Sequence, residues 1–260
     1  DHYDPANYLK PKKNVLKPGQ AEVPPIENGA VIGAGVMGAG IAHWMATRDF
    51  PVLLRDIDES AVARGMQNIH RRFEEAVGRR ILTANEARTK EGLVFPSADP
   101  VPMRHLDLVI EAATEDFGIK KEIFADLERR VAPETILATN TSALPITELS
   151  MSLAHPQRII GLHFFNPVHR MKLVEVVHTE LTDPVVIQSA LDFVRKLGKS
   201  PVLVKDSPGF LVNRILMPYL IEAGHLLESG VAPRTIDEAM LDFGMPVGPI
   251  RLLDDIGLDV

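Results

Sequence analysis

The chain has 260 residues, of which 45% are hydrophobic and 24% charged, a balance typical of globular proteins. Its net charge of −7 disfavours nucleic acid as a partner, because a polyanion would be repelled, and the lack of cysteine excludes disulfides, thiol catalysis and thiolate metal sites. No apolar run approaches the ~20 residues of a membrane span, and the start lacks the apolar segment of a signal peptide, so we expect a cytoplasmic protein.

The first residues are rich in proline, lysine and polar side chains, and they lack an initiator methionine. This composition predicts a linker over residues 1–28, entered from an upstream segment. We therefore interpret the chain as a fragment of a longer polypeptide.

Residues 29–206 alternate short apolar segments with helical patterns, which predicts an α/β fold with a doubly wound sheet built from parallel βαβ units. The expected strands are 30–32, 52–55, 106–110, 136–139, 158–163, 173–177 and 202–204. The expected helices include 37–47, 59–77, 117–130 and 184–196. A capping box at Thr83 and Glu86 predicts a second, short helix, so residues 58–92 form a helical hairpin inserted between strands.

After the segment KDSPGF (205–210) the pattern becomes helical only, and Pro233 suits the first turn of a helix. We place a domain boundary near Ser207 and expect a smaller all-helical domain over residues 207–260. That domain is short, so we expect it to be partial. The final residues, DDIGLDV, give no clear terminal helix.

A glycine motif follows the first expected strand, with Gly33, Gly35 and Gly38 in the pattern GxGxxG. The first glycine allows a tight turn, the second lets backbone N–H groups approach a pyrophosphate, and the third lets the helix lie close to the strand. Val36 and Met37 open the helix, whose N-terminus favours anions. The motif predicts a Rossmann-type dinucleotide site, and the alternative is a glycine turn used for packing alone.

The second expected strand ends in Asp56, 18 residues beyond Gly38. A carboxylate at this place binds both ribose hydroxyls and repels a 2′-phosphate, so we expect NAD rather than NADP. Arg55 would soften this preference if its side chain turned toward the ribose. The alternative for Asp56 is a solvated strand end.

His163 and Glu175 lie twelve residues apart, each at an apolar expected strand. A histidine suits the transfer of a hydroxyl proton near neutral pH, and a neighbouring carboxylate orients its ring and stabilises the imidazolium. A glutamate among valines is costly to bury alone but tolerable beside a histidine. From these two residues alone, a structural core pair remains an equal alternative.

The remaining histidines show no metal-ligand spacing, and His169, which shares the segment HFFNPVH with His163, lacks a convincing third ligand. We therefore expect no metal site.

Four segments in this order, VIGAGVMGAGIA, ATNTSALPI, GLHFFNPVHRMKLVEVV and KDSPGFLVNRILMPYL, resemble the L-3-hydroxyacyl-CoA dehydrogenase family. The resemblance covers about residues 29–257. The leader also resembles the join between a crotonase-like domain and this dehydrogenase in multifunctional fatty-acid oxidation proteins. The resemblance therefore implies such an upstream domain.

The resemblance implies a role for each matching residue. His163 would be the catalytic base and Glu175 its orienting partner, while Ser142 would bind the substrate oxygen and Asn213 would hold the substrate from the second domain. Structural alternatives are a helix N-cap for Ser142 and a helix cap or bridge for Asn213.

Three further residues would border the cofactor by the same resemblance: Glu115, Lys120 and Asn166. A solvated helix residue is the alternative for Lys120. The family binds CoA over the helical hairpin, where Arg71 and Arg72, with two further arginines, would meet its phosphates. The alternative is a solvated charged face.

The resemblance thus implies NAD-dependent oxidation of (3S)-3-hydroxyacyl-CoA to 3-ketoacyl-CoA in fatty-acid β-oxidation. Two alternatives stay open: a non-catalytic NAD-binding relative, and a 3-hydroxybutyryl-CoA or 3-hydroxyacid dehydrogenase of synthetic direction. The family commonly forms dimers through its second domain, so a homodimer is in doubt for a shortened chain. Acyl-chain length and the direction of flux stay open.

Overall fold

The structure, a computed structural model, describes residues 24–256, and most of the predicted linker 1–28 lies outside them. The chain divides into two units, of which the first ends at Ser207 and the second begins at Pro208. Pro24 to Asn28 lead into the first unit, where Ile26 is buried and the backbone N–H groups of Glu27 and Asn28 donate to Asp107.

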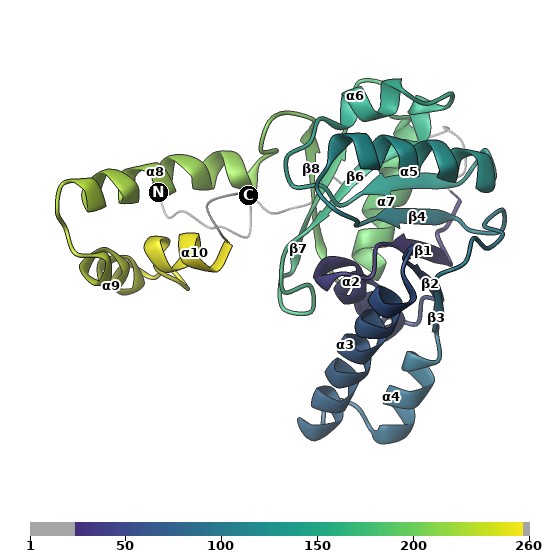
Figure 1. Cartoon of the computed structure of the whole chain (residues 1–260), viewed down its shortest axis with the longest axis horizontal. Coiled ribbons are helices and arrows are strands. Elements are labelled where there is room, and N and C mark those ends of the chain that lie inside the picture. Colours follow the sequence, from purple (N-terminus) through teal and green to yellow (C-terminus); the bar gives the residue numbers. More distant parts are fainter. Residues whose placement is uncertain (1–23, 257–260) are drawn as a thin grey trace, which may run out of the picture. The chain divides into compact units, whose positions relative to one another are not determined.

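The described part of the first unit contains one eight-stranded sheet in the order β3-β2-β1-β4-β5-β6-β7-β8 (Figure 1). Its strands are β1 (Gly29–Ile32), β2 (Val52–Arg55), β3 (Val94–Ser97), β4 (Leu108–Glu111), β5 (Ile136–Thr139), β6 (Ile159–Phe164), β7 (Leu173–His178) and β8 (Ser200–Lys205). The order reverses direction between β1 and β4, which is the topological switch point of a doubly wound fold. The predicted fold class is confirmed.

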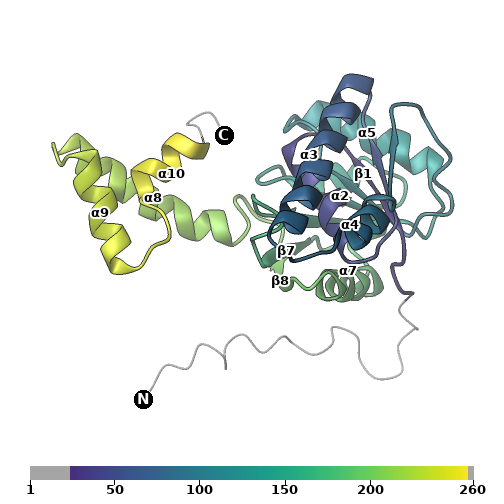
Figure 2. The ribbon, with the colours of Figure 1, turned by 90° about the horizontal axis from the view of Figure 1, so that it is seen from below.

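Helices cover both faces of this sheet, as Figures 1 and 2 show. They are α2 (Val36–Thr47), α3 (Glu59–Gly78), α4 (Ala84–Glu91), α5 (Phe117–Arg130), α6 (Ile146–Met151) and α7 (Pro184–Lys196), with a 3-10 turn η1 at Pro156–Arg158. In β4, Leu108 and Ile110 belong to the core cluster that includes α2 and α7. Successive side chains of a strand point to opposite faces, so Val109 and Glu111 face the other layer.

The predicted helical hairpin is α3 and α4, inserted between β2 and β3 (Figure 1). Asp58 caps α3 by accepting from the Ser60 N–H, and Thr83 with Glu86 forms the predicted capping box of α4. Both helices therefore begin where a side chain satisfies their first free N–H groups.

The structure corrects the strand predictions in two ways. Strand β3 was not predicted, because Pro96 removes an N–H donor, and such a residue is tolerated here since β3 is an edge strand that pairs only with β2. Parallel units were expected throughout, but β7 runs antiparallel to β6. Strand β8 is parallel to β7, so both strands run opposite to β6. The connection 165–172 is too short for a parallel crossover.

The second unit contains α8 (Val212–Glu228), α9 (Pro233–Phe243) and α10 (Pro249–Ile256) within its described residues. Pro233 occupies the first turn of α9 as predicted, and α9 ends at Gly244 with φ 110°. The prediction of no clear terminal helix is wrong, since α10 extends to Ile256. Its first turn is capped by a residue distant in sequence, Asp237 of α9, which accepts from the Ile250 N–H at 2.8 Å.

Candidate active site

The glycine turn lies at the carboxyl end of β1, where the sheet order reverses. Gly33 has φ 105°, and an added Cβ would lie 2.6 Å from the carbonyl oxygen of Ala112. An added Cβ at Gly38 would lie 1.8 Å from the carbonyl oxygen of Gly33. Both positions therefore require glycine, the first for backbone conformation and the second for close approach of helix and turn.

The N-terminus of α2 has the features of an anion site. Gly35 is its N-cap, no side-chain cap accompanies it, and no acidic residue stands in the first turn. An added Cβ at Gly35 would meet no described atom within 4 Å, and Val36 beside it is exposed while Met37 packs on the core. The free N–H groups and the helix dipole suit the pyrophosphate of a dinucleotide.

Asp56 follows β2 and turns toward this glycine loop. Its Oδ2 accepts from the Ala34 N–H at 2.7 Å, and its Oδ1 accepts from the Ile57 N–H at 2.7 Å. Arg55 donates from Nε to the carbonyl oxygen of Asp99 at 3.2 Å. The acid is thus fixed beside the turn, and the arginine is engaged elsewhere. These residues fit the adenosine half of NAD.

His163 and Glu175 are directly opposite residues of the antiparallel pair β6 and β7. His163 Nδ1 lies 2.7 Å from Glu175 Oε2, and both side chains are buried, the glutamate completely. Because an ionised carboxylate only accepts, Nδ1–H donates and the other ring nitrogen, Nε2, is left as the basic atom. The two residues that the sequence paired therefore form a buried, hydrogen-bonded couple.

Asn166 follows β6 in an exposed position and precedes a cis peptide bond to Pro167. The loop 165–172 is held by a residue that the sequence analysis missed. Lys199 donates from Nζ to the carbonyl oxygens of Val168 and Met171, and it lies over the Trp44 ring at 4.0 Å. Burial lowers the pKa of Lys199 to about 8. Lys199 lies between α7 and β8, and no pattern in the sequence around it indicated this contact.

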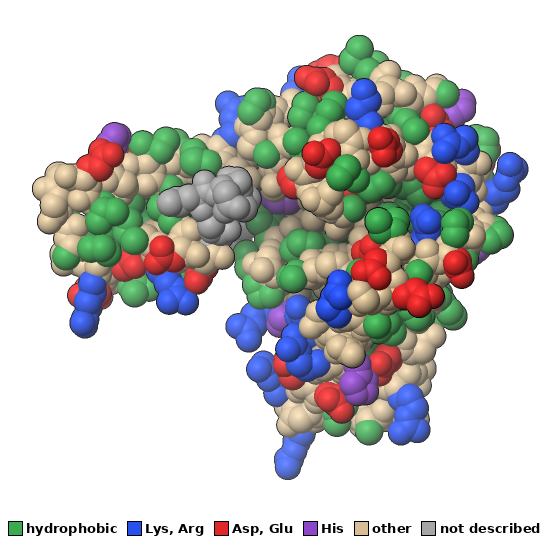
Figure 3. All heavy atoms as spheres, in the orientation of Figure 1, with side chains coloured by type: hydrophobic (Ala, Val, Ile, Leu, Met, Phe, Trp, Pro, Cys, Tyr) green, Lys and Arg blue, Asp and Glu red, His purple; other side chains and the backbone are tan. Residues whose placement is uncertain are grey.

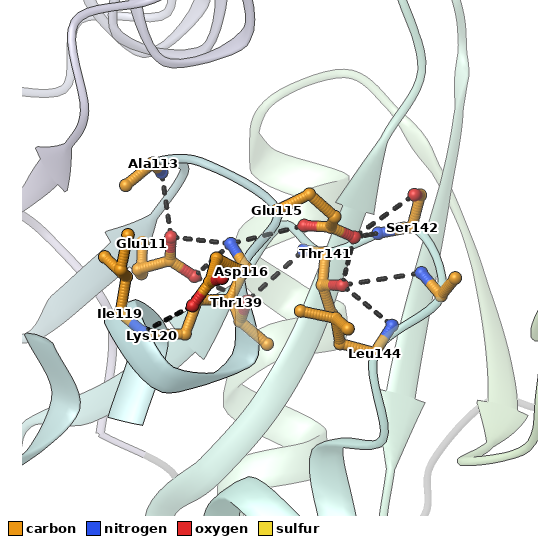
Figure 4. Close-up of polar contacts among 11 residues, drawn as sticks. Glu111, Ala113, Glu115, Asp116, Ile119, Lys120, Thr139, Thr141, Ser142 and Leu144 are labelled. Carbon is orange, nitrogen blue, oxygen red and sulfur yellow. Dashed lines mark hydrogen bonds and ion pairs between the residues drawn. The ribbon is translucent and has the colours of Figure 1, made fainter. Parts of the chain in front are cut away.

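Ser142 and Glu115 meet although they follow different strands (Figure 4). Glu115 Oε1 accepts from the Ser142 N–H at 2.9 Å, from the Ser142 hydroxyl at 3.2 Å and from the Thr141 hydroxyl. Burial alone would raise the pKa of Glu115, but the hydrogen bonds from Thr141 and Ser142 and the charge of Lys120 hold it below its usual value. The carboxylate is therefore ionised near neutral pH.

Lys120 is buried, with 1% of its surface exposed, so the alternative of a solvated helix residue is wrong. Its ammonium group donates to both oxygens of Glu111 at 2.7 and 2.9 Å and pairs with Glu115 at 3.4 Å (Figure 4). Glu111 was not predicted as a site residue, and the expected strand 106–110 stopped one residue before it, whereas β4 includes it. The N-cap alternative for Ser142 is also wrong, since Pro145 occupies that place before α6.

Asn213 lies in the first turn of α8 in the second unit, and Leu211 is the N-cap of that helix. Asn213 is therefore not the N-cap residue of α8.

The two arginines predicted to meet CoA differ in their surroundings. Arg71 is exposed and donates to Asn68, whereas Arg72 is half-buried and donates from Nη1 to His169 Nδ1 at 2.6 Å. Burial, and next the charge of Arg72, lower the pKa of His169. Figure 3 shows basic side chains interspersed with acidic ones around the hairpin. Only Arg71 of these two points freely toward solvent.

The histidines outside the buried couple include His43, which is buried against Phe73 and whose pKa burial lowers to about 3. Within residues 24–256 no group of three or more histidine, aspartate or glutamate side chains is placed to hold a metal ion. Over the same residues, no helix is both long and apolar enough to cross a membrane.

A doubly wound sheet, a glycine turn at its switch point and an acidic residue after the second strand define a dinucleotide-binding protein of the Rossmann class. Two family descriptions match the chain: "3-hydroxyacyl-CoA dehydrogenase, NAD binding domain" over residues 28–207, and "3-hydroxyacyl-CoA dehydrogenase, C-terminal domain" over residues 209–260. The chain belongs to the 3-hydroxyacyl-CoA dehydrogenase family.

Individual relatives agree with this assignment. The fatty acid oxidation complex subunit alpha of Vibrio campbellii is 41% identical over 242 residues, which cover 93% of this chain and 34% of that protein. The crystal structure of FadB2 from M. tuberculosis matches with a TM-score of 0.88 and 38% identity, over 91% of this chain and 84% of that one. The (S)-3-hydroxybutyryl-CoA dehydrogenase PaaH1 from Ralstonia eutropha gives 0.87 and 37%, over 90% and 83%. This chain thus spans about a third of the length of the curated relatives it matches.

Proposed function

We propose that the protein oxidises (3S)-3-hydroxyacyl-CoA to 3-ketoacyl-CoA with NAD, as a step of fatty-acid β-oxidation. The observation that carries this proposal is the buried contact between His163 and Glu175, in a chain that belongs to the 3-hydroxyacyl-CoA dehydrogenase family. The couple supplies the proton transfer that alcohol oxidation requires.

In the proposed reaction, Nε2 of His163 takes the proton of the 3-hydroxyl group. Glu175 keeps the ring in the tautomer that leaves Nε2 free of a proton, and its charge stabilises the imidazolium formed. NAD, when bound, accepts the hydride from C3 of the substrate. In reduction, the same imidazolium returns the proton to the oxygen.

The cofactor contacts divide between the two sides of the switch point. Gly33, Gly35, Val36, Met37 and Gly38 would hold the pyrophosphate at the N-terminus of α2. From its place after β2, Asp56 would hold the adenosine ribose. On the basis of the family resemblance, Glu115, Lys120 and Asn166 would border the nicotinamide half.

The substrate contacts are also proposals. Ser142 would bind the substrate oxygen, and Asn213 would hold the substrate from the second unit. Arg71, on an exposed face, is better placed for the phosphates of CoA than Arg72, whose guanidinium is engaged with His169. A direct phosphate contact by Arg72 would require that hydrogen bond to be exchanged.

The partners of the whole protein are inferred from its relatives. This chain covers 34% of a fatty acid oxidation complex subunit alpha, which supports a longer polypeptide. That the remainder includes an upstream crotonase-like domain is proposed from the family resemblance of the leader. A cytoplasmic location and a homodimer stay predictions.

A substrate panel tests the proposal in the full-length protein. Acetoacetyl-CoA and a long-chain 3-ketoacyl-CoA should be reduced with NADH, and NADPH and free acetoacetate should serve far less well. Turnover of the free acid but not the thioesters would contradict the proposal. NADH binding without any turnover would favour a non-catalytic relative instead.

A short-chain enzyme is the second candidate, because one of the similar structures is a 3-hydroxybutyryl-CoA dehydrogenase. The same panel separates the two: activity confined to the four-carbon thioester would favour the short-chain reaction.

A further inference from the structure

A buried carboxylate, Glu111, lies beside the candidate site and has no part in the proposed proton transfer. It is the last residue of β4, and its register partners are Ile32 at the end of β1 and Thr139 at the end of β5. Glu111 therefore stands at the switch point itself, where open α/β sheets bind their ligands.

The carboxylate of Glu111 accepts hydrogen bonds from Lys120, from the backbone of Ala113 and from Thr139. Oε1 accepts from Lys120 Nζ at 2.7 Å and from the Ala113 N–H at 2.8 Å, and Oε2 accepts from Lys120 Nζ at 2.9 Å and from Thr139 Oγ1 at 2.7 Å. Glu111 has 0% of its surface exposed. Four hydrogen bonds from three donor groups thus offset the cost of burying the charge.

Lys120 transmits this position to the next carboxylate. Its ammonium lies 2.7 Å from Glu111 Oε1 and 3.4 Å from Glu115 Oε2. The Glu115 side chain is 42% exposed, and this contact engages Oε2, the carboxylate oxygen that does not accept from Thr141 or Ser142. Glu115 in turn accepts from the backbone and hydroxyl of Ser142 (Figure 4).

The same carboxylate also holds the backbone against the glycine turn. Glu111 fixes the Ala113 N–H, and that nitrogen would lie 2.8 Å from a Cβ added at Gly33. The turn and the Ser142 segment therefore share one buried anchor.

We infer that Glu111 is a positioning residue, which fixes Lys120 and Glu115 and through them the orientation of Ser142. This inference rests on the proposed function for the role of Ser142. A buried ion pair contributes little net stability compared with apolar side chains of similar size. We therefore attribute the pair of Glu111 and Lys120 to its role beside the site rather than to stabilisation of the fold.

A double-mutant cycle in the full-length protein tests this role, using Glu111→Gln, Ser142→Ala and both together. At saturating NADH, Glu111→Gln should lower kcat/KM for acetoacetyl-CoA about tenfold, and less than about threefold once Ser142 is alanine. An equal factor in both backgrounds would overturn the inference.

Glu128→Gln is the matched control. Glu128 accepts from two backbone N–H groups and pairs with Arg158 at 3.4 Å, as Glu111 pairs with a lysine. Arg158, however, precedes β6 and so lies at the amino end of the parallel strands, whereas Glu111 lies at the carboxyl end of β4. This variant should lose thermal stability while keeping kcat/KM. If Glu111→Gln behaves in the same way, Glu111 serves only the fold.

Equilibrium titration with NADH separates this inference from the proposed function. Glu111→Gln should raise the NADH Kd about tenfold relative to Glu128→Gln, because Lys120 and Glu115 lose their fixed position. If the wild-type protein turns over no CoA thioester, the proposed function fails, and this titration still decides the inference. An unchanged Kd would then overturn it.

Glu111→Asp serves if the glutamine variant does not fold. Aspartate keeps the negative charge, but its side chain is shorter by one methylene group. In the same double-mutant cycle, kcat/KM should therefore fall by a smaller factor, and that factor should again shrink once Ser142 is alanine. A full wild-type kcat/KM and NADH affinity in Glu111→Asp would contradict a positioning role.

Discussion

Two fully buried glutamates lie in the same sheet, and each faces a basic partner at 2.7 Å, yet the two pairs differ in what they can do. Glu175 meets His163 across the antiparallel pair β6 and β7, and Glu111 meets Lys120 from α5. An imidazole exchanges a proton near neutral pH, whereas an ammonium group paired with a carboxylate stays charged. The first pair therefore suits proton transfer and the second suits only a fixed charge.

The connections of the two pairs follow the same division. His163 Nδ1 is hydrogen-bonded to Glu175, while the ammonium of Lys120 contacts a second carboxylate, Glu115, in addition to Glu111. Burial of a charged pair is thus no sign of catalysis by itself. The chemical type of the basic partner, imidazole or ammonium, decides which role the pair can have.

The largest expected effect is that of His163→Gln. Removing the base should lower kcat by about 10²- to 10⁴-fold, because general acid–base catalysis contributes on this order, while the NADH Kd stays unchanged. Steady-state kinetics with acetoacetyl-CoA measure it. His155→Gln, at an exposed histidine, is the matched control and should keep full activity. Turnover that survives in His163→Gln would end the distinction between the two pairs.

Glu175→Gln should have a smaller effect. The amide oxygen still accepts from Nδ1–H, but the charge that stabilises the imidazolium is lost, and carboxylates that orient functional histidines contribute about 10- to 100-fold. The loss in kcat should disappear when His163 is already glutamine, because the two residues act as a unit. If both backgrounds show the same loss, Glu175 acts on something other than the imidazole.

The smallest effect concerns stability at acid pH. The pKa of Glu115 is lower in the folded chain than its ordinary value of 4.5, so the unfolded chain binds more protons as the pH falls through this range. The stability that Glu115 contributes is therefore present above about pH 4.5 and lost as the pH falls through the lowered pKa.

Urea unfolding between pH 3 and 6 measures this linkage, with the fluorescence of Trp44, the one tryptophan of the chain, reporting on the first unit. The midpoint of the wild-type chain should fall more steeply toward acid pH than that of Glu115→Gln. Parallel curves would show that the carboxylate is not held by its partners.

Most of the architecture could be predicted because it follows from short-range rules. Alternation of apolar strands and helices indicates a doubly wound sheet, glycine spacing marks its first turn, and the capping box at Thr83 begins α4. Strand β3 was not predicted, because Pro96 is unusual within a strand and is tolerated only at the edge of a sheet. The antiparallel direction of β7 was not predicted, because strand direction depends on the path of the connection before it.

The candidate site divides in the same way. The sequence by itself determined the residue types that chemistry requires: the glycines of the turn, Asp56, and a histidine with a glutamate twelve residues later. Only the tertiary structure decided which atoms meet. The contact of His163 with Glu175 depends on the antiparallel register of β6 and β7. The series of contacts from Glu111 through Lys120 and Glu115 to Ser142 joins residues of β4, the segment after it, α5 and the segment after β5. Such contacts arise from packing between distant segments, which no local pattern encodes.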